Sequence, residues 1–138
     1  MERAKAKHLV LILARELASN VATPMLIIDP DGILVYFNEP AEALLGETFA
    51  STGEMSIAKW AVRHRPESLD GAPYELEAWA LSGTMLHHRP SQDTFRFSAG
   101  DGRLREVTAA LYPLIVSAGE YVGAVAIFWE RVEDGGSA

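Results

Sequence analysis

The first part of the chain places apolar side chains at helical spacing. Residues 2–20 contain neither Gly nor Pro, and their apolar positions recur three and four residues apart, the pattern of an amphipathic helix. The members of this apolar stripe are Ala6, Leu9, Val10, Leu13 and Leu17. We therefore predict an amphipathic helix over residues 1–19.

Two short strands and a helix are predicted next. Residues 25–29 and 33–37 are rich in Ile, Leu and Val, and the Asp-Pro-Asp-Gly sequence between them suits a tight turn. Asn38 can accept a hydrogen bond from a backbone N–H in the following turn, and Gly46 stands where a short helix would end. The pattern predicts a hairpin followed by a capped helix.

The middle of the chain favours further short helices. Residues 54–65 and 73–82 have helical patterns, and Pro73 is placed to open the second of them while Gly83 is placed to close it. A proline and a glycine break the chain between the two segments. We expect helices here and no strand.

The last third alternates apolar and polar side chains. Residues 94–98, 104–116 and 121–130 read as three strands joined by glycine-bearing turns. Because the elements do not alternate regularly between strand and helix, a parallel α/β sheet fits poorly. The predicted fold class is α+β, a five-stranded antiparallel sheet with short helices on one face. The domain spans residues 20–132, and residues 133–138 form a frayed tail.

Composition narrows the possible functions. A chain of 138 residues with 49% hydrophobic side chains can bury one core, and its formal net charge of −7 argues against nucleic-acid binding. The apolar run at residues 9–14 is too short to cross a membrane, and no cleavable signal pattern follows it. We therefore expect a cytoplasmic protein with no membrane insertion.

Two regions of the sequence resemble a PAS domain. The first is PMLIIDPDGILVYFNEPAEALLG at residues 24–46, and the second is GDGRLREVTAALYPL followed by GEYVGAVAIFWE near the end of the chain. The resemblance implies a sensory and interaction module that is often dimeric and acts on an effector domain or partner outside this chain. Many PAS domains end in an Asp-Ile-Thr-like triplet, whereas this chain has Glu130-Arg131-Val132.

The resemblance and the strand alternation together suggest a ligand pocket between the sheet and the helices. The candidates on the sheet are Leu26, Val35, Phe37, Phe97, Val107, Ala109, Leu111, Ala126 and Phe128, and those on the helical side are Trp60, Leu76 and Trp79. The interpretation that we favour is that these side chains are simply the hydrophobic core. The alternative is an apolar small molecule, for which Ala109 and Ala126 would leave room.

The sequence supports no cofactor. It has no cysteine, which excludes disulfides, a flavin-cysteinyl adduct of the light-oxygen-voltage type and the photoactive yellow protein chromophore. Haem-binding relatives generally place an axial His on the helix corresponding to residues 73–82, which holds none here. His87 and His88 follow it, and adjacent residues on an extended segment cannot easily hold one metal together. Haem is therefore the less favoured form of the ligand alternative.

No catalytic motif is present. The sequence has no Ser-His-Asp order, phosphate-binding glycine loop or His-Glu metal spacing, so we predict that the protein is not an enzyme. Arg63, His64 and Arg65 form the one basic cluster. Such a cluster can bind a carboxylate ligand, but we interpret it as a solvated face.

The N-terminal helix is the predicted interaction surface. Its stripe either folds back on its own sheet or packs on a second copy of the chain. We predict a homodimer, and its interface candidates are Leu9, Val10, Leu13 and Leu17. Two functions stay open: a regulatory dimerisation module without a ligand, and a sensor of a small apolar molecule.

Overall fold

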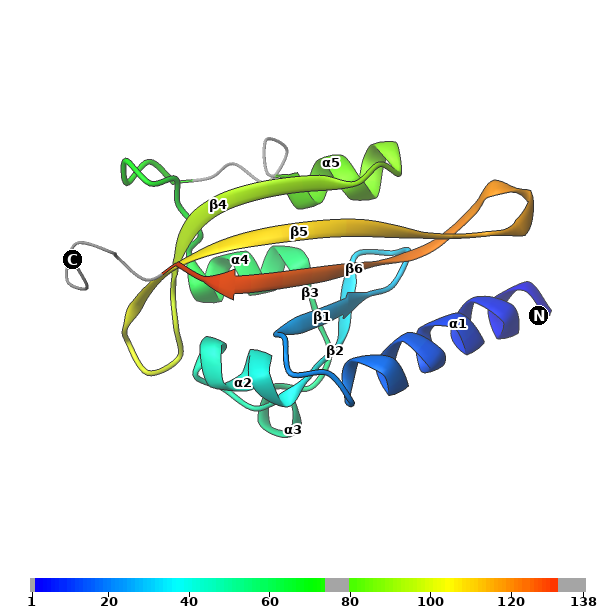
Figure 1. Cartoon of the computed structure of the whole chain (residues 1–138), viewed down its shortest axis with the longest axis horizontal. Helices are drawn as coiled ribbons and strands as arrows, with labels where there is room; N and C mark the ends of the chain where they lie inside the picture. Colours follow the sequence, from blue (N-terminus) through cyan, green and yellow to red (C-terminus); the bar gives the residue numbers. More distant parts are fainter. Residues whose placement is uncertain (1, 74–79, 132–138) are drawn as a thin grey trace.

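The computed structural model describes residues 2–73 and 80–131. Within them the chain forms one antiparallel sheet in the order β3-β2-β1-β6-β5-β4 (Figure 1). The strands are β1 (Met25–Ile28), β2 (Ile33–Phe37), β3 (Met55–Ser56), β4 (Ser91–Ser98), β5 (Leu104–Val116) and β6 (Glu120–Glu130). The helices are α1 (Glu2–Ala18), α2 (Glu39–Leu45), α3 (Phe49–Thr52), α4 (Ile57–His64) and α5 (Ala80–His87), with a 3₁₀ turn at Ser117–Gly119.

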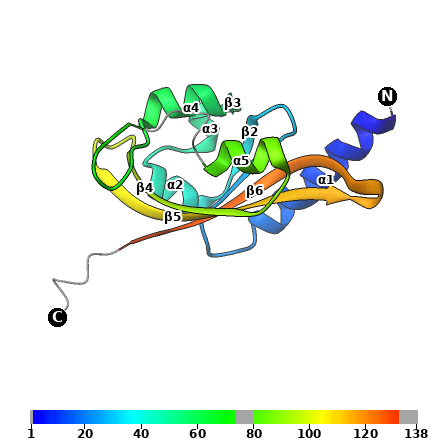
Figure 2. The same cartoon turned by 90° about the horizontal axis from the view of Figure 1, so that it is seen from above.

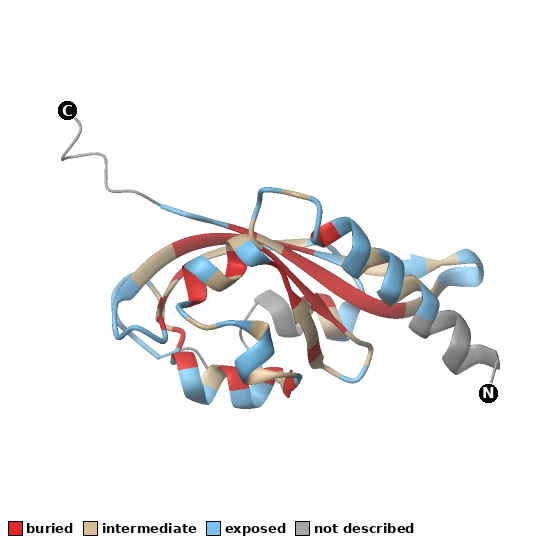
Figure 3. Cartoon of the chain, turned by 90° about the horizontal axis from the view of Figure 1, so that it is seen from below, coloured by how far each residue is buried: buried red, intermediate tan, exposed pale blue. Residues whose placement is uncertain are grey.

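The helices cover the two faces of the sheet unequally. Helices α2 to α5 gather on its concave face, while α1 lies against the opposite face (Figures 2 and 3). Successive side chains along a strand point to opposite faces of the sheet, so each strand contributes to the core on both faces. In β6, Ala124 and Ala126 face the concave side, while Val125 faces α1. The predicted α+β class is confirmed. The sheet has six strands where we predicted five, because the two-residue β3 pairs with β2.

The hairpin and the capped helix near the start are also confirmed. The N-cap of α2 is Asn38, whose Oδ1 accepts from Ala41 N at 3.1 Å, and Gly46 ends the helix in the left-handed conformation at φ 74°. Asn38 is 1% exposed and makes three further hydrogen bonds. Its side chain therefore fixes the place where α1, β1 and α2 meet.

A bulge in β2 changes which side chains face the core. Ile27 pairs with Tyr36, but Ile28 pairs with Leu34, so Val35 is an extra residue in β2. Val35 was predicted to face the pocket together with Phe37. It packs instead with the cluster beneath α1. The prediction for Val35 was wrong because strict alternation was assumed across the bulge.

Two helix boundaries also differ from the prediction. The segment 54–65 is divided into β3 and α4, and the Ser56 side chain caps α4. Helix α5 continues through Gly83 to His87 and is followed by His88 at φ 55°. A helical glycine costs only about 1 kcal/mol relative to alanine, so one glycine need not end a helix. Residues 74–79 and the predicted tail at 133–138 lie outside the described residues.

Helix α1 packs on the sheet through a different stripe from the predicted one. Ala18 is fully buried and Leu11 and Ala14 pack beside it, whereas Leu9, Leu13 and Leu17 are 55%, 60% and 62% exposed. Leu11 of α1 lies close to Gly123 of β6, where a Cβ would be 3.0 Å from Leu11 Cδ2. The apolar stripe read from the sequence is therefore the outward one.

Candidate functional site

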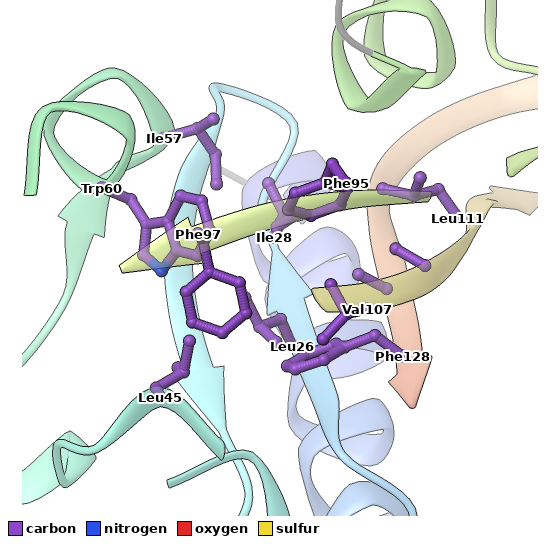
Figure 4. Close-up of a pocket in the computed structure, with 12 residues that line it drawn as sticks. Leu26, Ile28, Leu45, Ile57, Trp60, Phe95, Phe97, Val107, Leu111 and Phe128 are labelled. Carbon is purple, nitrogen blue, oxygen red and sulfur yellow. The ribbon is translucent and has the colours of Figure 1, made fainter. Parts of the chain in front are cut away.

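The concave face of the sheet encloses a cavity with an apolar lining (Figure 4). The cavity is small. Its volume, measured as the space open to the centre of a water-sized sphere, is about 40 Å³, and on the same measure one water needs ~10–15 Å³. The lining residues are Leu26, Ile28, Leu45, Ile57, Trp60, Phe95, Phe97, Val107, Ala109, Leu111, Ala126 and Phe128. Strands β1, β4, β5 and β6 supply most of them, and α2 and α4 close the other side.

Eight of the twelve candidate pocket residues line this cavity. They are Leu26, Trp60, Phe97, Val107, Ala109, Leu111, Ala126 and Phe128. Phe37 is buried in the same core beside the cavity, with its ring 5.4 Å from that of Phe49. Val35 faces α1, while Leu76 and Trp79 lie outside the described residues.

Four lining residues were not predicted, although the sequence carries a signal for each. Phe95 shares strand parity with Phe97, and Ile28 shares it with Leu26. Leu45 and Ile57 lie on short helices whose apolar faces the periodicity could have assigned. For Leu45 and Ile57 the missing step was the position of the helix relative to the sheet.

Large and small side chains alternate across the middle of the sheet. Ala109 pairs with Phe128, and Ala126 pairs with both Leu111 and Leu26. The large partners fill most of the space that the alanines leave, so only the small cavity remains. An almost entirely apolar lining gives water few partners, so a site of this kind suits apolar atoms.

A polar cluster around the buried His64 lies beside the cavity, at the end of α4. His64 is 1% exposed, and its Nδ1 lies 2.7 Å from the Ser98 carbonyl oxygen while its Nε2 lies 3.1 Å from a Glu47 carboxylate oxygen. Arg63 Nε donates to both oxygens of the same carboxylate at 2.8 Å. We interpreted residues 63–65 as a solvated face, and for His64 that was wrong. His64 lies four residues after Trp60 and seven after Ile57, on the buried face of α4.

The electrostatics of this cluster centre on Glu47. The hydrogen bond from Arg63 holds the pKa of the Glu47 carboxyl below its usual value, and partial burial opposes that shift. Glu47 reciprocally raises the pKa of Arg63. Glu47 is therefore an acceptor-only carboxylate at neutral pH.

The two histidines considered for haem lie elsewhere. His87 is the last residue of α5 and is exposed, and the His88 ring stacks on that of Tyr121 at 4.1 Å. Burial raises the pKa of Tyr121, with a smaller contribution from Asp29. The described residues contain no cluster of three or more His, Asp or Glu placed to hold a metal, and no described helix is both long and apolar enough to cross a membrane.

Comparison of the fold with solved structures identifies its class. The PAS domain of BvgS from Bordetella pertussis aligns with a TM-score of 0.63 over 92% of this chain and 90% of that chain, at 16% identity. The Rhodobacter sphaeroides LOV protein aligns with 0.68 over 89% and 68%, at 14% identity. The PAS domain of nitrogen regulation protein NR(II) from Vibrio parahaemolyticus aligns with 0.58 over 86% and 98%, at 18% identity.

The chain therefore has the PAS fold that its sequence predicts. No protein-family model and no curated protein sequence matches the chain. Because the sequence identities are low, the likeness defines the fold and not the ligand, and any function has to be argued from the surfaces and the cavity of this chain.

Proposed function

We propose that the chain is a cytoplasmic, non-catalytic regulatory sensor module that forms a homodimer through α1 and acts on an effector domain or partner outside this chain. The observation that carries the proposal is that the last part of α1, residues 9–18, is apolar except at Arg15 and Glu16. One stripe packs on the sheet through Leu11 and Ala14, while Leu9, Leu13 and Leu17 form a second stripe that is more than half exposed. Because the packed stripe and the exposed stripe are both apolar, we expect the exposed one to be buried against another surface.

A second copy of the chain is the proposed occupant of the exposed stripe. Leu9, Leu13 and Leu17 are spaced four residues apart along one side of α1, with Ile12 beside them, 43% exposed. In a symmetric pair the same stripe from each copy meets itself, so no further complementary surface is needed. Val10, which is partly exposed at the edge of this stripe, completes the proposed interface.

Light scattering after size-exclusion chromatography tests the dimer. The intact chain should have about twice the mass of the 15.1 kDa monomer, and Leu13→Glu should reduce it to the monomer because a charge cannot be buried unpaired. Leu86→Glu is the matched control, since Leu86 is 68% exposed on α5, across the sheet from α1. A monomeric wild type would contradict the proposal.

Signal transfer is proposed to run through α1 and the end of β6. Glu130 takes the acidic place of the usual PAS triplet, and its carboxylate accepts from Arg105 Nη1 at 2.9 Å. Arg131 N donates to the Glu106 carbonyl at 2.8 Å, so pairing with β5 continues past the strand end. An output segment joined there would be held by β5.

The alternative function is the sensing of a small apolar ligand, favoured by the apolar cavity. Native mass spectrometry and an absorption spectrum of the purified protein test it, because a bound molecule adds mass and a haem adds a Soret band. Ala109→Trp separates the two interpretations. It should release a ligand if one is bound, whereas in a solid core it should mainly lower stability, by about 1–3 kcal/mol.

A further inference from the structure

Two alanines make room in the middle of the sheet. Ala109 of β5 and Ala126 of β6 are the smallest side chains in the lining of the cavity. Ala109 pairs with Phe128, and Ala126 lies between its two partners, Leu26 and Leu111. Because the alanine side chains end at Cβ, part of the space above them is left open. Protein interiors contain few voids larger than a water molecule, so this one calls for an explanation.

The helical wall of the cavity is tied to the sheet at two points. Ile57 N, at the start of α4, donates to the Gly32 carbonyl in the β1–β2 turn at 3.0 Å. At the other side, Gly100 N in the β4–β5 turn donates to the carbonyl of Leu45, the last residue of α2, at 2.7 Å. The side chains of Ile57 and Leu45 both line the cavity. The cavity is therefore preformed, and a molecule that enters it need not order the wall.

The chemistry of the lining selects a nonpolar occupant. Of the twelve lining side chains, only that of Trp60 contains a polar atom. A molecule that forms hydrogen bonds in water would lose them on entry and find almost no replacement, which costs free energy. The rings of Phe95, Phe97 and Phe128 instead offer many carbon atoms for dispersion contacts (Figure 4). The lining therefore suits a neutral, nonpolar molecule.

The volume of the cavity limits the size of the occupant. An apolar cavity of roughly 150 Å³ stays dry and binds benzene or xenon, whereas this cavity has about 40 Å³. Because one water-sized particle needs ~10–15 Å³, the cavity holds about three of them. The occupant therefore has about three heavy atoms or fewer. A benzene ring is too large for this space, and so is a haem.

We propose that the cavity is a preformed binding site for a dissolved nonpolar gas, such as dioxygen or ethene. The gas molecule lies over Ala109 and Ala126 and is held by dispersion contacts. This inference rests on the ligand-sensing alternative proposed above and narrows it to one class of ligand. Val125 and Ile127, on either side of Ala126, pack in the layer beneath α1. The strand that binds the gas therefore also supports α1.

Methyl ¹H–¹³C spectra of the full chain under increasing xenon pressure test the site. The methyl signals of Ala109 and Ala126 should shift and reach a plateau as the site fills. The signal of Ala110 should stay still, because Ala110 is the next residue of β5, points to the opposite face and pairs with Ile127. Dioxygen and ethene should perturb the same two signals, and the gas that does so at the lower pressure is the preferred ligand. The absence of a saturable xenon shift would overturn the proposal.

Filling the cavity with a larger side chain provides a matched pair of variants. Ala126→Val occupies the space of the gas, so the xenon shift at Ala109 should disappear. Ala110→Val adds the same side chain on the opposite face and should keep that shift. If Ala126→Val does not fold, Ala109→Val serves in its place and is followed at the Ala126 methyl. Xenon shifts that persist in the folded, filled variant would overturn the proposal.

Benzene tests the size limit and separates this inference from ligand sensing in general. The wild-type chain should not bind benzene, whereas Leu111→Ala should bind it, because removing a large side chain from the lining enlarges the cavity. Benzene binding by the wild type would overturn the proposal. A larger apolar molecule found in the purified chain by native mass spectrometry would also overturn it, while supporting the broader ligand-sensing function.

Discussion

Asn38 Nδ2 donates to the Ala18 carbonyl at 2.9 Å and thereby joins the last residue of α1 to the N-cap of α2. The same amide nitrogen donates to the Thr23 carbonyl at 2.9 Å, and Oδ1 accepts from Met25 N and Ala41 N. A side-chain amide can make all four bonds together, because its nitrogen donates two hydrogen bonds and its oxygen accepts two. The position of the proposed dimerisation helix therefore depends on one buried side chain.

Asn38→Asp should be strongly destabilising. The aspartate keeps the size and the cap acceptor but loses both donors, and it turns a buried negative charge toward the carbonyls of Ala18 and Thr23. We expect a loss of roughly 3–5 kcal/mol in the free energy of unfolding, the cost of a buried charge without a partner. Urea unfolding followed by circular dichroism measures it.

Thr48→Asp is the matched control for this prediction. Thr48 caps α3 by accepting from Ser51 N, and its side chain is exposed, so the aspartate keeps the cap without burying a charge. Its effect should stay within about 0.5 kcal/mol. Equal effects of the two substitutions would mean that the bonds to Ala18 and Thr23 contribute little.

Glu47 should make stability depend on acidic pH. Its pKa is lower in the folded chain than its usual value of 4.5, so its contribution is fully present above that value and is lost as the pH falls through the folded pKa. The urea midpoint of wild type should exceed that of Glu47→Gln at neutral pH, and the gap should close in acid. A gap that stays constant with pH would show that shape, and not charge, explains the difference.

The sequence predicts this fold well where local chemistry decides the structure. The Asn38 cap, the Gly46 stop and the alternation from residue 94 onward each follow from local rules, and the long β5–β6 pairing carries most of the cavity prediction. The prediction from sequence fails at Val35 because a run of apolar residues does not show where a bulge lies. It fails at His64 because a basic side chain is buried only by the tertiary partners Glu47 and Ser98.

The orientation of α1 shows a different limit. Both of its stripes are apolar, so periodicity alone cannot say which one the sheet takes. Space favours the observed choice, because the sheet offers a glycine at position 123, where a Cβ would lie 3.0 Å from Leu11 Cδ2, and the other α1 side chains in this layer, Ala14 and Ala18, are small. The predicted stripe with Leu9 and Leu13 then remains exposed.

Two glycine substitutions should have opposite effects on stability. A Cβ at Gly123 would lie 2.5 Å from the Ile28 carbonyl oxygen and 3.0 Å from Leu11 Cδ2, at a φ of +145°. Gly123→Ala should therefore cost at least ~1–3 kcal/mol in strain and push α1 from the sheet. A Cβ at Gly83, inside α5, meets nothing within 4 Å, so Gly83→Ala should add about 1 kcal/mol through helix propensity.

Thermal and urea unfolding of both glycine variants measure the difference, and hydrogen exchange along α1 locates it. Because the same side chain is added in each case, the comparison removes the general effect of a methyl group on the unfolded chain. Faster exchange around Leu11 of α1 should appear in Gly123→Ala and not in Gly83→Ala. If Gly123→Ala were as stable as wild type, the close packing of Leu11 against β6 would not hold α1 in place, and the outward direction of the proposed dimerisation stripe would lose its structural basis.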